Sequence, residues 1–269
     1  MPDPRRLRRW KFAAVGAVVA VVLYAWLVET RWVEVTHATE TIGLESPIRV
    51  AHLTDLHTRG LGAAEERVLA ILEDTKPDLI AITGDTVDGG NWEAARPVLS
   101  RLHAPLGVFL VDGNWEHWSM AHAPSRWFAA LGVRRLDNEA VRVRGDLHVV
   151  GIDDRTGGSP KPAPALEPVP KGGAALLLFH SPIEFDVVAP MARERCGASR
   201  ALALAGHTHG GQIRLPWLGA IWTPPGSGSY VEGAYALGEM RMRVSRGIGT
   251  SVVPMRLACR PEVSIVTLR

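Results

Sequence analysis

Five short segments of the sequence place carboxylate, amide or imidazole side chains directly after runs of apolar residues. The side chains that could bind a metal ion are Asp55 and His57, Asp85, Asn114, His180, and His207 and His209. Mixed carboxylate, amide and imidazole ligands suit Mn²⁺, Fe or Zn²⁺ better than Ca²⁺. Because each apolar run predicts a strand, we expect these side chains to lie at strand ends and to form a metal site.

Two of the segments contain a pair of candidate ligands separated by one residue. In an extended chain, side chains two positions apart point to the same side, so Asp55 and His57 are expected to face one site, as are His207 and His209. Glycines flank three of the five segments. They permit tight turns and leave space for a ligand to approach the backbone.

The apolar runs and the stretches between them predict an α/β fold. Strands are expected at 48–53, 79–83 and 107–111, helices at 65–74 and 92–102, and further strands at 141–143, 148–152, 174–179, 201–205, 240–244 and 264–268. The alternation of strand, loop and helix is typical of an α/β sandwich whose strand ends carry function. Residues 159–170 hold five prolines and predict an irregular surface loop.

The N-terminal segment predicts a membrane anchor. Residues 12–28 give 17 uncharged positions, at the short end of the range that crosses a bilayer. Arginines precede this run, so the positive-inside rule leaves the N-terminus in the cytoplasm and the catalytic part in the periplasm or outside the cell. The alternatives are a buried core helix, which needs a polar face, and a cleaved signal peptide, which needs a small-x-small site; neither feature is present in this stretch.

This interpretation divides the chain into four parts and bounds its partners. We expect a basic cytoplasmic segment at 1–11, a transmembrane anchor at 12–28, a connector at 29–46 and one catalytic domain at 47–269. The formal charge of +2 comes largely from the first eleven residues, which disfavours nucleic acid as a partner. The sequence leaves open whether Cys196 and Cys259 pair.

The five segments, taken in order, resemble the calcineurin-like metallophosphoesterase superfamily, whose blocks run D-x-H, G-D, G-N-H-[DE], H and G-H-x-H. Residues 206–212, 244–250 and 260–262 are similar to an exported or membrane-anchored subgroup of bacterial phosphohydrolases. The resemblance implies a four-layer α/β/β/α sandwich after one transmembrane helix. It also implies that Asp55, His57 and His209 bind one metal, that Asn114, His180 and His207 bind the other, and that Asp85 bridges them.

The expected chemistry is hydrolysis of a phosphate ester or pyrophosphate with two divalent cations, manganese, zinc or iron. Two cations about 3.5–4 Å apart can bind a phosphoryl oxygen and lower the pKa of a shared water. A bridging ligand needs two anionic oxygens, which fits the carboxylate of Asp85. The neutral oxygen of Asn114 limits how far the ligands reduce the acidity of the metals, so Asn114 is expected to serve catalysis as well as binding.

The chain departs from the family where a histidine usually follows the asparagine. Trp115 stands there, followed by Glu116 and His117. We expect His117, or less readily Glu116, to donate a proton to the leaving group. The alternatives are an acidic leaving group, such as a pyrophosphate, that needs no proton, and a domain that binds metals with little turnover.

Other features are assigned to structure or to substrate binding. His37, His52, His103, His122 and His148 are expected to be structural. The apolar residues between 215 and 222 predict either a lip beside the site or an internal loop. An apolar lip favours a lipid-linked phosphate as the substrate. The alternative functions are those of a soluble-nucleotide phosphodiesterase or phosphatase, and of a non-catalytic membrane-bound metal-binding module. The sequence does not specify the substrate, the native metals or the oligomeric state.

Overall fold

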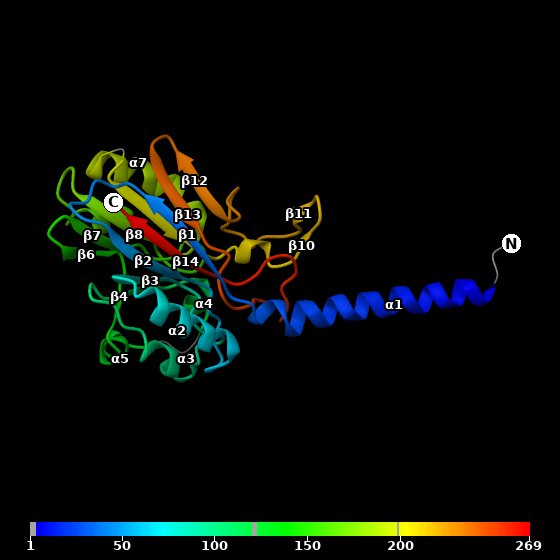
Figure 1. Ribbon diagram of the computed structural model, residues 1–269. Helices are drawn as coiled ribbons and strands as arrows, with labels where there is room; N and C mark the ends of the chain where they lie inside the picture. Colours follow the sequence, from blue (N-terminus) through cyan, green and yellow to red (C-terminus); the bar gives the residue numbers. More distant parts are fainter. Residues whose placement is uncertain (1–3, 120–122, 198) are drawn as a thin grey trace.

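The computed structural model describes residues 4–119, 123–197 and 199–269 as two stacked β-sheets with helices on both outer faces and one long N-terminal helix (Figure 1). The first six-stranded sheet has the order β1-β14-β2-β3-β4-β5. Its strands are β1 (Glu34–Glu40), β2 (Ile48–Leu53), β3 (Leu79–Thr83), β4 (Val108–Val111), β5 (Val133–Arg135) and β14 (Glu262–Leu268). Strands β2 to β5 are parallel, and β14 is antiparallel to β2.

The second six-stranded sheet has the order β12-β13-β9-β8-β7-β6. Its strands are β6 (Glu139–Arg144), β7 (Leu147–Gly151), β8 (Ala174–Leu178), β9 (Ala201–Ala205), β12 (Gly233–Leu237) and β13 (Met240–Val244). The four central strands are parallel and the two edge pairs are antiparallel. Every residue of β7, β8 and β9 is buried, which explains why these strands read as continuous apolar runs.

Helices complete the four layers. Helices α2 (Ala63–Thr75), α3 (Trp92–Leu99) and α5 (Ser125–Ala130) cover the first sheet, and α6 (Pro162–Leu166) and α7 (Phe185–Cys196) cover the second. A third apolar cluster lies between the sheets, where Val50 and Leu79 of the first sheet and Leu176 of the second belong to one core. The expected α/β/β/α sandwich is confirmed.

Two segments placed outside regular elements by the sequence form a strand and a helix in the structure. Residues 34–40, placed in the connector, form β1, which pairs in parallel with β14 and so belongs to the first sheet. The proline-rich stretch 159–170 contains α6, which begins at Pro162 and buries Ala165 and Leu166 against the second sheet. Proline at the first helical position has no N–H to leave unpaired, so it starts this helix instead of preventing it.

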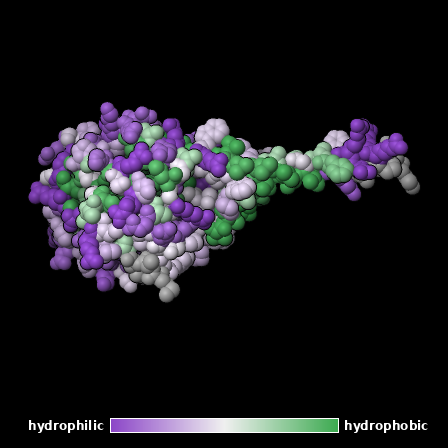
Figure 2. Space-filling view, turned by 90° about the horizontal axis from the view of Figure 1, so that it is seen from below, coloured by the Kyte–Doolittle hydropathy of each residue, from purple (hydrophilic) through white to green (hydrophobic). Residues whose placement is uncertain are grey.

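Helix α1 (Pro4–Leu27) projects from the globular part (Figure 1). It is the one helix among the described residues that is long and apolar enough to cross a membrane, and most of that stretch is exposed. Beyond its hydrophilic N-terminal end, the helix presents a mostly hydrophobic surface that reaches the adjoining end of the globular part (Figure 2). The same length and composition fit a signal sequence.

The two cysteines are buried free thiols. Cys196 ends α7 on the outer face of the second sheet, whereas the Sγ atom of Cys259 lies 3.2 Å from the carbonyl oxygen of His209. The structure therefore decides the alternative left open by the sequence, because the two residues do not form a disulfide.

Candidate metal centre

The seven predicted ligands all follow strands of the two sheets. Asp55 and His57 follow β2, Asp85 follows β3, Asn114 follows β4, His180 follows β8, and His207 and His209 follow β9. These strands run parallel within each sheet, so their carboxyl ends lie at one edge. Asn114 is the first residue of the short helix α4 (Asn114–Trp118), and His209 begins the 3₁₀ turn His209–Gly211.

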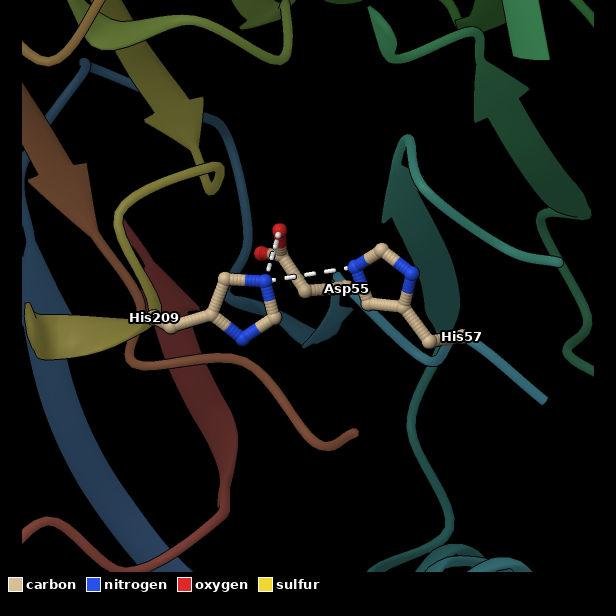
Figure 3. Close-up of side chains that lie close together, drawn as sticks. All are labelled: Asp55, His57 and His209. Atoms are coloured by element: carbon tan, nitrogen blue, oxygen red, sulfur yellow. Dashed lines mark hydrogen bonds and ion pairs between the residues drawn. The ribbon is translucent and has the colours of Figure 1, made fainter. Parts of the chain in front are cut away.

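Asp55, His57 and His209 form the first cluster (Figure 3). All three side chains are buried, and their ligand atoms lie within 4.8 Å of one another. The Nε2 atoms of His57 and His209 are 3.2 Å apart, and His209 Nε2 is 3.3 Å from Asp55 Oδ1. A carboxylate and two imidazoles therefore turn their donor atoms toward one point.

Asp85, His180 and His207 form the second cluster. These side chains are also buried, and their ligand atoms also lie within 4.8 Å of one another. His180 Nε2 lies 3.2 Å from Asp85 Oδ2, 3.0 Å from His207 Nδ1 and 3.1 Å from Asn114 Oδ1. The same Asp85 Oδ2 atom is 3.6 Å from His57 Nε2 of the first cluster. Asp85 therefore lies between the two clusters.

The outer nitrogens of three histidines meet hydrogen-bond acceptors. His180 Nδ1 is 2.7 Å from the carbonyl oxygen of Thr83, and His207 Nε2 is 2.8 Å from that of Pro225. His57 Nδ1 is 2.9 Å from Asp88 Oδ1. Donation of the outer N–H fixes the tautomer that leaves the inner nitrogen free as a ligand, which is the usual arrangement at metal-binding histidines. The donor sets and their surroundings thus fit two divalent cations.

The backbone of the clusters is held in an unfavourable conformation. Five of the seven residues have positive φ: Asp55, His57, Asp85, His207 and His209. The left-handed region is disfavoured for residues with a Cβ, and such positions concentrate at functional sites. The extended conformation expected for the two one-residue-gap pairs is therefore wrong, and consistently the pair at 207 and 209 divides between the two clusters.

Two glycines provide the space in which the carboxylates lie. A Cβ atom on Gly206 would come within 2.5 Å of Asp55 Oδ2, and one on Gly113 would come within 2.2 Å of Asp85 Oδ1. Both distances are far shorter than any stable contact. These glycines are needed for close approach, since neither has a positive φ.

The charges of the site favour the ionised form of Asp85 and the unprotonated form of His209, whereas neighbouring carboxylates, although burial opposes it, raise the pKa of His57 and of His180. Although burial opposes it, the neighbouring His180 and His57 lower the pKa of Asp85. Burial lowers the pKa of His209 well below its usual value, and His57 and Arg256 add to this effect. An ionised carboxylate and an unprotonated imidazole are the forms that coordinate metals.

The residues after Asn114 lie in three different environments. Trp115 lines the cavity and meets the His57 ring edge-on, with centroids 5.3 Å apart. Glu116 accepts hydrogen bonds from the backbone N–H groups of Gly113, Asp85 and Thr86, and burial beside carboxylates raises its pKa to about 7.

His117 turns toward a carboxylate. Its Nε2 atom is 2.6 Å from Asp153 Oδ1, and His117 is not among the residues that line the cavity. Asp153 raises the pKa of His117 although burial opposes it. The role of His117 as proton donor stays a prediction.

A cavity of about 670 Å³ opens beside the clusters. Asp85, Asn114, His207 and His209 form part of its wall. Trp118, Ile221, Trp222, Val252 and Val253 supply apolar side chains to the same cavity. The space next to the candidate ligands is therefore largely apolar.

The remaining histidines that the structure describes lie outside the clusters. His52 is buried in β2 with Nε2 2.8 Å from Thr83 Oγ1, and burial lowers its pKa to about 4. His148 is buried in β7, His37 lies in β1 and His103 is exposed. His122 lies outside the described residues.

Sequence reasoning missed two residues that contact the clusters. Asp88 lies only three positions after Asp85, so its contact with His57 could have been suspected. Arg256 is completely buried, with Nη2 3.3 Å from His209 Nδ1. It lies 47 positions from that histidine, and no local pattern marks it.

Comparison with known proteins defines the class. The sequence profile of the calcineurin-like phosphoesterase family matches residues 48–211. The chain belongs to this family and is a metal-dependent phosphoric ester hydrolase, with two candidate metal-binding sites that fit a dinuclear centre.

Individual relatives resemble the chain over most of its length. The metallophosphoesterase YkuE of Bacillus subtilis, described as uncharacterized, is 29% identical over 91% of this chain and 89% of its own. The phosphodiesterase YaeI of Escherichia coli is 32% identical over 83% of both chains. A bovine transmembrane protein with a metallophosphoesterase domain is 29% identical over 82% of this chain and 53% of its own.

Proposed function

We propose that this protein is a membrane-anchored hydrolase that uses two divalent cations to cleave a phosphoester or pyrophosphate bond of a lipid-linked substrate. The observation that carries the proposal is the position of Asp85. Its Oδ2 atom lies 3.2 Å from Nε2 of His180 and 3.6 Å from Nε2 of His57. One carboxylate thus reaches both clusters of candidate ligands. This is the arrangement that a dinuclear site requires.

The proposed ligands follow the two clusters. Asp55, His57 and His209 would hold one cation, Asn114, His180 and His207 the other, and Asp85 both. When bound, the pair would supply Lewis acidity to a phosphoryl oxygen and would acidify a water molecule. Imidazole, amide and carboxylate donors favour manganese, zinc or iron.

The residues of the chain orient this chemistry. Thr83 and Pro225 accept the outer N–H groups of His180 and His207 and so fix the direction of their inner nitrogens. The backbone N–H of Trp115 donates to Asp85 Oδ1 over 2.9 Å, which leaves Oδ2 directed at both clusters. The neutral oxygen of Asn114 adds a donor without further negative charge.

The cavity supports a lipid-linked substrate. The candidate ligands in its lining suit a phosphate group, and Ile221, Trp222 and Val252, which line the same cavity, suit an acyl or prenyl chain. Helix α1 would hold the domain at the surface where such a substrate lies. A soluble phosphodiester is the second candidate substrate, favoured by the 32% identity to the phosphodiesterase YaeI.

We further propose the division of the chain and its orientation as the sequence suggests them. Residues 1–11 would be cytoplasmic, 12–28 would span the membrane, 29–46 would connect, and 47–269 would act in the periplasm or outside the cell, with β1 adding the connector to the first sheet. A Leu237→Cys variant tests this, because Leu237 is exposed and both native thiols are buried. A membrane-impermeant maleimide should label it in intact bacterial cells; labelling only after lysis contradicts the orientation.

The decisive experiment compares Asp85→Asn with the parent chain, both loaded with Mn²⁺. Loss of the shared carboxylate should reduce hydrolysis of bis-p-nitrophenyl phosphate and of a polyisoprenyl diphosphate by more than about 100-fold, beyond the usual effect of residues that only support ligands. Asp74→Asn is the matched control, because Asp74 is an exposed carboxylate on α2. Equal activity of Asp85→Asn and the parent would refute dinuclear catalysis.

A further inference from the structure

Two loop tips beside the cavity carry highly exposed apolar side chains. The hairpin of β10 (Arg214–Leu215) and β11 (Gly219–Ala220) ends in Trp217 and Leu218, which are 102% and 76% exposed. Val252, in the loop after β13, is 84% exposed. Large apolar groups this accessible to water are unfavourable unless another apolar phase covers them.

The backbone at both tips is strained. Trp217 and Val252 each have a φ of 65°, in the left-handed region. This conformation is disfavoured for any residue with a Cβ, and most of all for a β-branched residue such as Val252. Glycine would adopt it without strain. Side chains retained at such positions indicate a function for the side chains themselves.

Both tips are built on the stretch of chain that receives the end of α1. The backbone N–H of Arg256 donates to the carbonyl oxygen of Ala25 over 3.0 Å. The adjacent Leu257 accepts from the N–H of Arg214, at the start of the hairpin, over 2.9 Å. The end of α1 and the base of the hairpin thus bind adjacent residues of one segment.

Gln212 joins the second tip to the first. Its Nε2 atom donates to the carbonyl oxygens of Ser251 and Val253, and its Oε1 atom accepts from the N–H of Ser251. Gln212 lies two positions before the first residue of the hairpin, so the loop around Val252 is fixed to the base of the hairpin. In Figure 1 the β10–β11 hairpin projects from the same end of the globular part as α1.

We propose that the tips at Trp217–Leu218 and at Val252 insert into the lipid bilayer beside α1 and hold the mouth of the cavity on the membrane surface. The inference rests on the proposed membrane anchorage, and it adds a second, peripheral contact to the transmembrane one. The hydrophobic surface of α1 continues onto this end of the globular part (Figure 2), so one apolar phase can cover the helix and the tips together.

Aromatic and cationic side chains mark the level of the membrane surface. Trp32 follows the end of α1 and stacks under the guanidinium of Arg260 at 3.7 Å. Trp26 and Arg31 are also exposed in this region. Tryptophan and arginine are the residues enriched at the interface, where arginine meets lipid phosphates. Vesicles with anionic lipid are therefore the suitable probe.

The consequence for the site concerns access. Val252 and Trp222 line the same cavity as Asp85 and His209. Insertion of the tips would open this cavity toward the bilayer, so a phosphate on a lipid could reach the candidate ligands without its chain leaving the apolar phase. The inserted tips would thereby favour membrane-borne substrates over soluble ones.

The test places an environment-sensitive fluorophore at each tip of the full-length chain. Leu218→Cys and Val252→Cys can be labelled selectively because Cys196 and Cys259 are buried. Val187→Cys on α7 is the control, since Val187 is exposed on a helix that covers the second sheet. The proteins are reconstituted into phosphatidylcholine vesicles with one-third phosphatidylglycerol, and quenching is measured with nitroxide-labelled acyl chains and with aqueous iodide.

Nitroxide should quench the labels at 218 and 252 at least about threefold more than the label at 187, with iodide showing the opposite order. If iodide quenched all three labels to the same extent, the proposed contact of the two tips with the bilayer would be overturned. A chain that does not float with the vesicles would overturn the anchorage and the contact together. Full quenching in a chain without metal-dependent hydrolysis would leave the contact standing and overturn only the proposed function.

A kinetic arm uses residues that do not line the cavity. Trp217→Ser with Leu218→Ser should raise KM for a vesicle-borne polyisoprenyl diphosphate about tenfold and leave hydrolysis of soluble bis-p-nitrophenyl phosphate within about twofold of the parent. Val187→Ser with Met191→Ser changes two exposed apolar side chains of α7. This control should change neither the KM for the vesicle-borne substrate nor the hydrolysis of the soluble one. Equal KM values for the two double variants would contradict an inserted hairpin.

Discussion

The guanidinium of Arg256 lies against the imidazole of His209, with Nη2 3.3 Å from Nδ1. At the other three clustered histidines the outer nitrogen faces an acceptor, whereas at His209 it faces a donor. Arg256 is fully buried and bonds the carbonyl oxygens of Gly249 and Arg246, so protein dipoles compensate its charge. It also connects the site to the end of α1 through its own backbone N–H.

Replacement of Arg256 should therefore affect stability and metal binding together. Arg256→Met leaves four carbonyl oxygens, two in buried and two in part-buried hydrogen bonds, without this donor and should lower the free energy of unfolding by about 2–4 kcal/mol. It should also weaken Mn²⁺ binding about 10–100-fold, since His209 loses its support. Arg256→Lys keeps the positive charge but has fewer hydrogen-bond donors, so its stability and its Mn²⁺ affinity should lie between those of the parent and of Arg256→Met. Urea unfolding measures the stability, and metal titration in detergent micelles measures the Mn²⁺ affinity. A destabilised variant with unchanged Mn²⁺ affinity would show that Arg256 only supports the fold.

A single methyl group at position 206 should damage the first cluster. In Gly206→Ala the new Cβ would lie 1.9 Å from Thr54 Oγ1 and 2.5 Å from Asp55 Oδ2, so Asp55 must move. We expect metal content to fall from two ions toward one per chain, with hydrolysis reduced by more than about 100-fold. Gly145→Ala is the matched control, because its nearest neighbour is the end of the Arg142 side chain at 3.7 Å. Two tightly bound ions in Gly206→Ala would contradict this account.

Metal removal should lower the stability of the chain. At 100 times the dissociation constant, one bound ion adds about 2.7 kcal/mol to the free energy of unfolding. For a domain of this size that amount corresponds to a rise in Tm of about 5 °C or more. Chelation should therefore lower Tm, and Mn²⁺ should restore it in the parent but not fully in Asp85→Asn. A Tm that does not respond to chelator or to Mn²⁺ would argue against tight binding by the clusters.

The sequence predicted the central strands and the convergence of the seven side chains for physical reasons that are local. Strands β3, β8 and β9 are buried throughout, and β2 is buried except at Arg49, so these strands are recognisable as mostly apolar runs, and the polar residues directly after them have to lie at the strand ends. Helix α7 was not predicted, because Pro190 interrupts a pattern that is only weakly amphipathic. Strand β1 was missed because most of its residues are partly exposed on an edge strand.

What the sequence could not provide is the conformation and the surroundings of the ligands. The left-handed backbone of Asp55 and His207 is imposed by tertiary contacts, such as the bond from the N–H of His207 to Asp55 Oδ2 across 152 positions. The contact of Arg256 with His209 likewise depends on the folded loop after β13. Interactions between distant segments leave no periodic pattern, so these features follow only from the structure.

The pair of His117 and Asp153 should stabilise the fold over a limited pH range. Asp153 raises the pKa of His117, so the contribution of the imidazolium is complete below about pH 6.5 and is lost as pH rises through the folded-state pKa. Although burial opposes it, His117 lowers the pKa of Asp153, so that contribution is lost as pH falls below about 4. His117→Gln should therefore lose up to about 1 kcal/mol between pH 4 and 6.5 and progressively less above that range. His103→Gln, at an exposed position, is the control; a pH-independent difference would exclude the ion pair.

The proton donor can be tested by the acidity of the leaving group. If His117 protonates it, His117→Gln should slow hydrolysis of an alkyl phosphodiester by about 100-fold or more, while bis-p-nitrophenyl phosphate, with its acidic leaving group, changes by less than about threefold. The raised pKa favours the charged form of His117, but its ring has to turn from Asp153 toward the cavity. Trp115 already lines that cavity, so Trp115→His in the His117→Gln background should restore part of the lost alkyl activity. Unchanged rates in His117→Gln for both substrates would reject His117 as the donor and favour a substrate, such as a pyrophosphate, whose leaving group departs without a proton.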